Sequence, residues 1–104
     1  MGWRLKMAGM LIGLFGLVVA ARWAIVQLRK ILDWFRNRSQ LALRDKNNLS
    51  FTIKEEMAQG NYVVYQGIYN EASGELLDGQ KVMAPQMDTD FANLHRDVPL
   101  VIYQ

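Results

Sequence analysis

The chain has 104 residues, a formal net charge of +2 and no cysteine. This length leaves room for one small domain, and the lack of cysteine excludes disulfides and thiolate metal sites as ways of stabilising it. Ten basic and four acidic residues give +6 in residues 1–60, whereas two basic and six acidic residues give −4 in residues 61–104. Phosphate would repel the acidic half, so the composition argues against nucleic acid as a partner.

The N-terminus carries an apolar run that is typical of a membrane-spanning helix. The run extends from Met7 to Ala21 and is bracketed by Trp3 and Trp23. At about 1.5 Å per helical residue, the two indoles would lie roughly 30 Å apart, which matches the hydrocarbon core of a bilayer. Residues 1–26 are therefore predicted to form a transmembrane helix. The residues expected at its membrane interfaces, with the basic residues that follow, are Trp3, Arg4, Lys6, Arg22, Trp23, Arg29 and Lys30.

A secretory signal peptide is the alternative for the same segment. Arg4 and Lys6 would form its basic region, and residues 19–21 its small-residue cleavage pattern. Apolar residues resume after that pattern, which favours the spanning helix. Basic residues on the C-terminal flank outnumber those on the N-terminal flank, so the positive-inside rule places the C-terminal domain on the cytoplasmic, or equivalent, side.

Small residues recur along the apolar run at helical spacing. They are Gly9, Gly13, Gly16 and Ala20, which would share one face of a continuous helix. Such a face lets the backbone of a second helix approach closely. It predicts docking on another membrane protein subunit, although glycine is also simply common in spanning helices.

Residues 27–48 are predicted to form a basic amphipathic juxtamembrane helix and a loop. Leu28, Ile31 and Phe35 recur at helical spacing, with basic residues elsewhere on the helix. This pattern is expected to lie along anionic lipid headgroups or to pack on a helix of a partner.

Residues 49–60 allow two predictions. Thr52 and Glu55 have the spacing of a capping box, and Gly60 stands where a short helix would end. Leu49, Phe51 and Ile53 alternate, which indicates a strand instead. A short connecting helix is the preferred prediction.

Residues 61–104 are predicted to form a small β-β-α-β domain. A run rich in β-branched and aromatic residues (62–69), a set of turn residues (70–74) and a returning segment (75–83) indicate a hairpin. Asp88 is expected to cap a two-turn helix, and residues 100–103 to form the closing strand.

A helical crossover would place that closing strand parallel to the second strand and beside the first, in the order 2-1-3. One helix would cover one face of this sheet. The other face would be left with tyrosines for binding a partner, namely Tyr62, Tyr65 and Tyr69.

No residue pattern indicates catalysis. His95 is the only histidine and has no second histidine, cysteine or paired carboxylate at ligand spacing. Asp88 and Asp90 are better explained as helix N-terminal charges than as cation ligands. The chain is therefore predicted not to be an enzyme, with no catalytic residue, cofactor, metal or small-molecule substrate.

Together these features predict an α+β membrane protein with one N-terminal transmembrane helix, an amphipathic extension and the small C-terminal domain. The first functional hypothesis is a single-pass accessory or assembly subunit of a larger membrane complex, energy-transducing complexes included. The second is a membrane-tethered adaptor that recruits a soluble partner through its C-terminal domain. The third is a membrane-perturbing peptide, which the acidic C-terminal domain disfavours.

Overall fold

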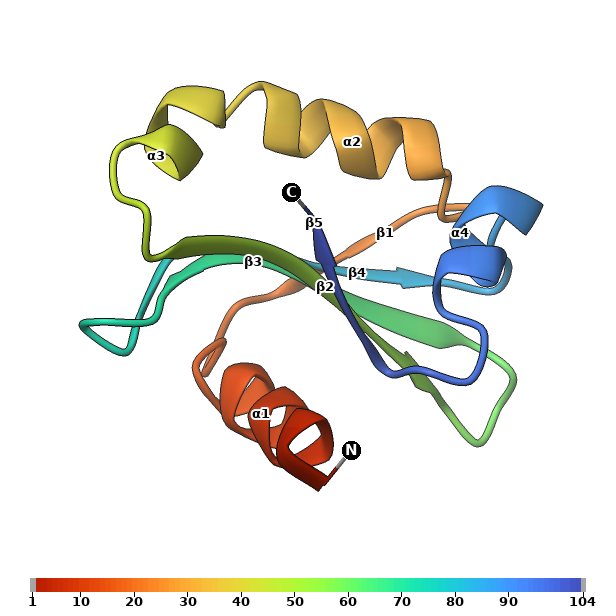
Figure 1. The fold of residues 1–104 in the computed structure, drawn as a ribbon. Coiled ribbons are helices and arrows are strands. Elements are labelled where there is room, and N and C mark those ends of the chain that lie inside the picture. Colours follow the sequence, from red (N-terminus) through yellow and green to blue (C-terminus); the bar gives the residue numbers. More distant parts are fainter. Residues whose placement is uncertain (1, 104) are drawn as a thin grey trace.

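The computed structural model describes residues 2–103, with side chains from residue 7 onward. The strands form one mixed five-stranded sheet in the order β1-β4-β3-β2-β5. Figure 1 shows α1 on one side of this sheet and α2 and α3 on the other. The elements in chain order are α1 (Gly2–Gly13), β1 (Ala20–Arg22), α2 (Leu28–Arg36), α3 (Ser39–Leu43), β2 (Asn48–Glu56), β3 (Tyr62–Asn70), β4 (Glu75–Ala84), α4 (Thr89–Leu94) and β5 (Leu100–Tyr103).

The central hairpin of β3 and β4 confirms the sequence prediction. The two strands pair antiparallel from Tyr62 opposite Ala84 to Asn70 opposite Glu75. The turn between them contains Gly74, whose φ of +75° lies in the left-handed region that glycine adopts without strain. The β-branched and aromatic composition of β3 suits a strand that is buried on both faces.

The helix and strand that follow the hairpin are also confirmed, but their place in the sheet is not. Asp88 caps α4 by accepting a hydrogen bond from the backbone N–H of Phe91 at 2.9 Å. The closing strand β5 pairs antiparallel with β2 and does not lie beside β3. The predicted order 2-1-3 was wrong because residues 48–56 form an additional strand that occupies the position next to β3.

That additional strand, β2, replaces the short helix that was preferred for residues 49–60. Its alternating pattern buries Phe51 and Ile53 on the side of the sheet covered by α1, and Thr52 on the other side. β2 pairs along its length with β3 on one edge, and Ser50 to Ile53 pair with β5 on the other. Pairing on both edges satisfies the backbone of this segment, and it outweighs the local preference of a capping box.

The N-terminal segment is the main correction to the sequence analysis. The helix α1 ends at Gly13, Gly16 adopts a φ of +50°, and the chain then returns as β1 parallel to β4. Among residues 2–103, none of the helices has the length and apolar character needed to cross a membrane. The α+β membrane architecture and the integral, single-pass localisation with a cytoplasmic C-terminal domain were therefore wrong.

The physical reason is that the sheet covers one side of the apolar run. Leu11 and Phe15 are buried there against β2 and β3. The ring centroid of Phe15 lies 6.1 Å from that of Phe51 and 5.2 Å from that of Tyr65, both in edge-to-face geometry. Hydropathy records how apolar a segment is but not what covers it, so a helix packed on a sheet resembles one that crosses a bilayer.

Residues 27–48, expected along a membrane surface, form α2 and α3 on the opposite side of the sheet. Ile31 of α2 is buried in a second core with Val64, Val82 and Phe91. The side-chain amide of Gln66 donates to the backbone carbonyl of Ile31 at 2.7 Å, which fixes the helix on the strands beneath it. The apolar side of α2 thus faces the sheet, and the basic residues of the helix face outward.

Candidate partner-binding surface

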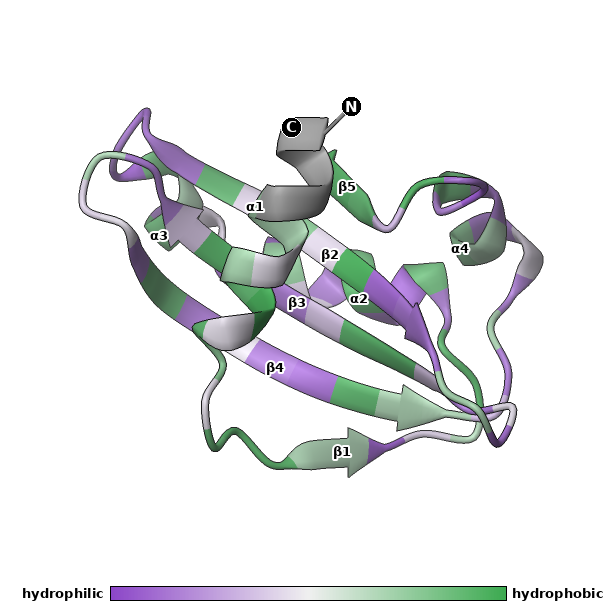
Figure 2. Ribbon diagram, turned by 90° about the horizontal axis from the view of Figure 1, so that it is seen from below, coloured by the Kyte–Doolittle hydropathy of each residue, from purple (hydrophilic) through white to green (hydrophobic). Residues whose placement is uncertain are grey.

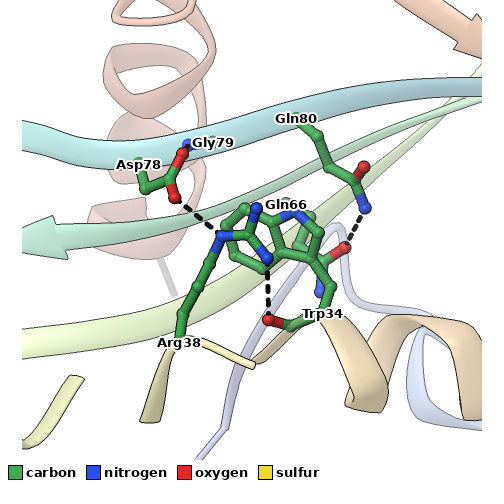
Figure 3. Close-up of polar contacts among 6 residues, drawn as sticks. All are labelled: Trp34, Arg38, Gln66, Asp78, Gly79 and Gln80. Carbon is green, nitrogen blue, oxygen red and sulfur yellow. Dashed lines mark hydrogen bonds and ion pairs between the residues drawn. The ribbon is translucent and has the colours of Figure 1, made fainter. Parts of the chain in front are cut away.

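A polar cluster between α2 and the sheet joins these elements of the fold. Figure 3 shows the guanidinium of Arg38 stacked over the ring of Trp34, at 3.9 Å from the ring centroid. Its Nε donates to Asp78 Oδ2 at 2.7 Å, and Nη1 donates to the carbonyl of Trp34 at 3.1 Å. Beside it, Gln80 donates to Gln66 at 2.7 Å. These contacts hold α2 to β4 and β3. The guanidinium of Arg38 is already bound within the fold by them.

A second polar network is buried under α4. His95 is 1% exposed, and its Nδ1 lies 3.1 Å from the carbonyl of Val98. Because a carbonyl only accepts, Nδ1 carries the proton and Nε2 accepts from the hydroxyl of Thr52 at 2.8 Å. Thr52 in turn accepts from the hydroxyl of Tyr103 at 2.7 Å. The chain of hydrogen bonds ties α4, β2 and β5 together and leaves His95 no access to a substrate.

Two open hollows of about 340 Å³ and 450 Å³ lie beside the connection between α3 and β2. Both are bordered by Asp45, whose carboxylate accepts from the backbone N–H of Asn47 and the amide of Asn70. These hydrogen bonds hold the pKa of Asp45 below its usual value. In the described part of the chain, every buried side-chain nitrogen and oxygen has a partner. Neither hollow therefore contains a buried polar group that needs a ligand to satisfy it.

Residues 2–103 contain no cluster of three or more His, Cys, Asp or Glu side chains that could hold a metal ion. The surface feature that does stand out is apolar. Four residues near the end of α1 and just after it form what we call the apolar ridge: Met10, Leu14, Leu17 and Val18. All four are exposed, and Leu17 is 99% exposed.

The apolar ridge exists because the N-terminal segment is apolar on both of its sides. Ala8, Leu11 and Phe15 lie on the buried side, at the spacing of one helical stripe. Met10 and Leu14 recur at the same helical spacing on the opposite side. An apolar stripe on a helix is normally covered, and here the sheet covers the stripe of Leu11 and Phe15 but leaves Met10 and Leu14 exposed. The other side is left exposed.

The predicted helix-docking residues do not share a helix face. Gly9 and Gly13 lie on α1, Gly16 lies in the turn that follows, and Ala20 lies on β1. A Cβ added at Gly9 or Gly13 would meet no atom within 4 Å, so the structure leaves open space beside both. Only the first two of the four therefore lie together, on the helix that carries the apolar ridge.

The predicted membrane-interface residues are scattered. Arg22 is exposed on β1 and Arg29 is exposed on α2. Trp23 is half-buried against the core under α2, with the Lys30 ammonium 5.4 Å from its ring centroid. In the part of the chain that the structure describes, no spanning helix joins these residues, and their contact with lipid stays a prediction. Three side chains of the predicted set lie outside the described ones: Trp3, Arg4 and Lys6.

The tyrosines predicted to bind a partner lie largely under α1. Tyr65 and Tyr69 are buried in the core that α1 completes, and Tyr62 is half-buried. The hydroxyl of Tyr65 donates to Glu55 at 2.9 Å. Burial, and next the hydrogen bond to Glu55, raises the pKa of Tyr65 to about 12. The sheet face that was expected to be open is thus covered by the segment that was assigned to the membrane.

The sequence contained a signal for the apolar ridge that was interpreted differently. Met10, Leu14 and Leu17 stood in the run assigned to a bilayer, where exposed apolar side chains need no further partner. Two opposite apolar stripes in one short segment would have indicated a helix with two apolar contacts. Comparison with known proteins adds no guide to function, since no protein-family model, curated protein or solved structure matches the chain.

Proposed function

We propose that this chain is a non-catalytic accessory subunit that binds a partner protein through the apolar ridge. The observation that carries the proposal is the exposure of four large apolar side chains on a segment whose opposite side is already packed on the sheet. Exposed apolar patches are typical of protein interaction sites. The accessory role is the part of the first functional hypothesis that does not depend on a spanning helix.

The polar groups of the fold support the same function. The two polar networks are used to join elements of the fold, and the hollows lack unsatisfied buried groups. An apolar surface also suits a stable assembly better than a transient adaptor, because burial of the ridge does not weaken at high salt as charge contacts do. A partner bound through the ridge should remain bound in concentrated salt.

The double variant Leu14→Ser and Leu17→Ser tests the proposal. The tagged full chain, purified from its native cells at native level, is expected to bring down one protein at fixed stoichiometry that resists high-salt washing. Loss of two leucine contacts should reduce recovery of that protein about tenfold or more. Quantitative mass spectrometry of the eluates measures the ratio.

Leu43→Ser is the matched control. Leu43 is 85% exposed on α3, on the opposite side of the sheet from α1 (Figure 1). This variant makes the same chemical change at an exposed leucine outside the ridge and should recover the partner as the wild type does. Two results would count against an accessory subunit bound through the ridge. One is that the double variant recovers as much partner protein as the wild type does, and the other is that high-salt washing removes the partner protein.

A further inference from the structure

The strand β1 forms one edge of the sheet, and Figure 2 shows no strand beyond it. The backbone N–H of Trp23 donates to the carbonyl of Met83 at 2.9 Å, so Trp23 faces β4. Backbone polar groups alternate in direction along a strand, so Ala21 also faces β4, whereas the N–H and C=O of Ala20 and Arg22 point away from the sheet. This edge is therefore available to a further strand.

We propose that β1 pairs antiparallel with β1 of a second copy of this chain, about a two-fold axis beside Ala21. In this register Ala20 of each copy lies opposite Arg22 of the other. These are the two residues whose backbone groups point outward, so a single symmetric register satisfies both copies. The two sheets then become one continuous sheet. The pairing goes beyond the proposed function, because it uses the backbone edge of β1 and not the side chains of the apolar ridge.

The side chains along β1 fit this two-fold register. The residue that meets its own copy at the axis is Ala21, at the position where antiparallel strands approach to about 4.5 Å between Cα atoms. A methyl group is small enough for that approach. One step outward, the same register sets Val19 opposite Trp23 of the second copy. Val19 is 87% exposed, and β-branched residues paired with aromatic ones across strands stabilise a sheet.

Charge gives the pairing a recognisable salt dependence. The exposed Arg22 of each copy would lie diagonally across the new pair of strands from Arg22 of the other, and each chain carries a net charge of +2. Like charges oppose association at low salt and are screened at higher salt. The dimer should therefore tighten as salt is added. An acidic strand from a different protein at the same edge would show the opposite dependence.

Two substitutions at Arg22 test the pairing in the purified full chain. Arg22→Pro removes an outward N–H from each side of the axis and leaves the inward groups of Ala21 and Trp23 bonded to β4. It should raise the dimer dissociation constant on the order of 100-fold, as measured by sedimentation equilibrium. Arg22→Ala keeps the N–H and removes the charge, so it should dimerise at least as tightly as the wild type.

The outcomes separate this pairing from other contacts. A wild-type chain that stays monomeric at millimolar concentration, or equal dissociation constants for Arg22→Pro and Arg22→Ala, would overturn it. Open-ended filaments would overturn it too, because they would indicate β1 pairing with β5. The Leu14→Ser and Leu17→Ser variant should still dimerise, and Arg22→Pro should still recover the partner protein. Failure of one proposal is thereby distinguished from failure of the other.

Hydrogen exchange of the wild type gives a second measurement that does not depend on how Arg22→Pro folds. The backbone amide of Arg22 points outward and is bonded only in the dimer. Its protection should rise with protein concentration, whereas the amide of Ala21, bonded to β4, should be protected at every concentration. Protection of the Arg22 amide that is independent of concentration would contradict pairing between two copies.

Discussion

Phe15→Ala is expected to lower the free energy of unfolding by about 3–5 kcal/mol, the usual cost of removing a buried phenylalanine ring. Phe15 is buried, and its ring contacts those of Phe51 and Tyr65 across the interface between the N-terminal segment and the sheet. The substitution removes both aromatic contacts and leaves a cavity. Urea denaturation of the full chain, followed by circular dichroism, measures the change.

Leu17→Ala provides the control in the same segment. Leu17 is exposed and makes no core contact, so its truncation should change the free energy of unfolding by about 0.5 kcal/mol or less. If the segment crossed a bilayer instead, the two substitutions would have similar effects on the remaining domain. Equal midpoints for the two variants would therefore contradict the packing of Phe15 on the sheet.

Acidification should destabilise the fold through His95. Burial is the main cause that lowers the pKa of His95 from 6.5 to about 4, and the nearby Lys54 adds to it. The hydrogen bond to Val98 acts in the opposite direction. A proton on Nε2 would also meet the oxygen of Thr52, which already accepts from Tyr103. The folded state therefore holds the imidazole neutral well below the pH at which the unfolded chain protonates it.

The sign of the pH dependence follows from this depressed pKa. Above pH 6.5 the imidazole is neutral in both states, and stability is at its full value. Between pH 6.5 and about 4 the unfolded chain binds a proton that the folded chain does not. Stability should fall there by about 1.4 kcal/mol per pH unit, for a total of about 3 kcal/mol.

His95→Gln isolates this contribution from that of the carboxylates. Glutamine can still accept from Thr52 and donate to Val98, but it does not titrate. Urea midpoints of both proteins at several pH values between 7 and 4 give the two slopes. The wild type should lose more stability than the variant over this range. Parallel slopes would show that the folded and the unfolded chain protonate His95 over the same pH range, which would contradict the lowered pKa.

The C-terminal half of the fold followed from local sequence signals. The run in β3, the turn at Gly74 and the cap at Asp88 each act within a few residues, so short-range chemistry is sufficient to predict them. Strand β2 could not be assigned in the same way. Its pattern allowed a helix or a strand, and pairing on both edges determines that it is a strand. One partner, β3, follows directly in the chain, but the other, β5, is distant in sequence.

The N-terminal half could not be predicted for a different reason. The sequence gives the apolar character of Met7 to Ala21, but not the surface that meets it. Leu11 and Phe15 are buried against the sheet, whereas Leu17 is exposed. Strand β1 has only three residues and carries no local strand signal, so its pairing with β4 depends entirely on the tertiary fold. The free strand edge was therefore beyond what the sequence pattern predicts, whereas the two apolar stripes of the segment did carry a signal for the apolar ridge.

The apolar N-terminal segment packs on the sheet through Leu11 and Phe15. Nuclear Overhauser effects in the isotopically labelled full chain test it most directly, because they report proton pairs within about 5 Å, the range in which packed side chains touch. The ring protons of Phe15 should show cross-peaks to those of Tyr65, whose ring centroid lies 5.2 Å away. Absence of these cross-peaks, with Phe15 contacting only detergent or lipid protons, would contradict the fold described here.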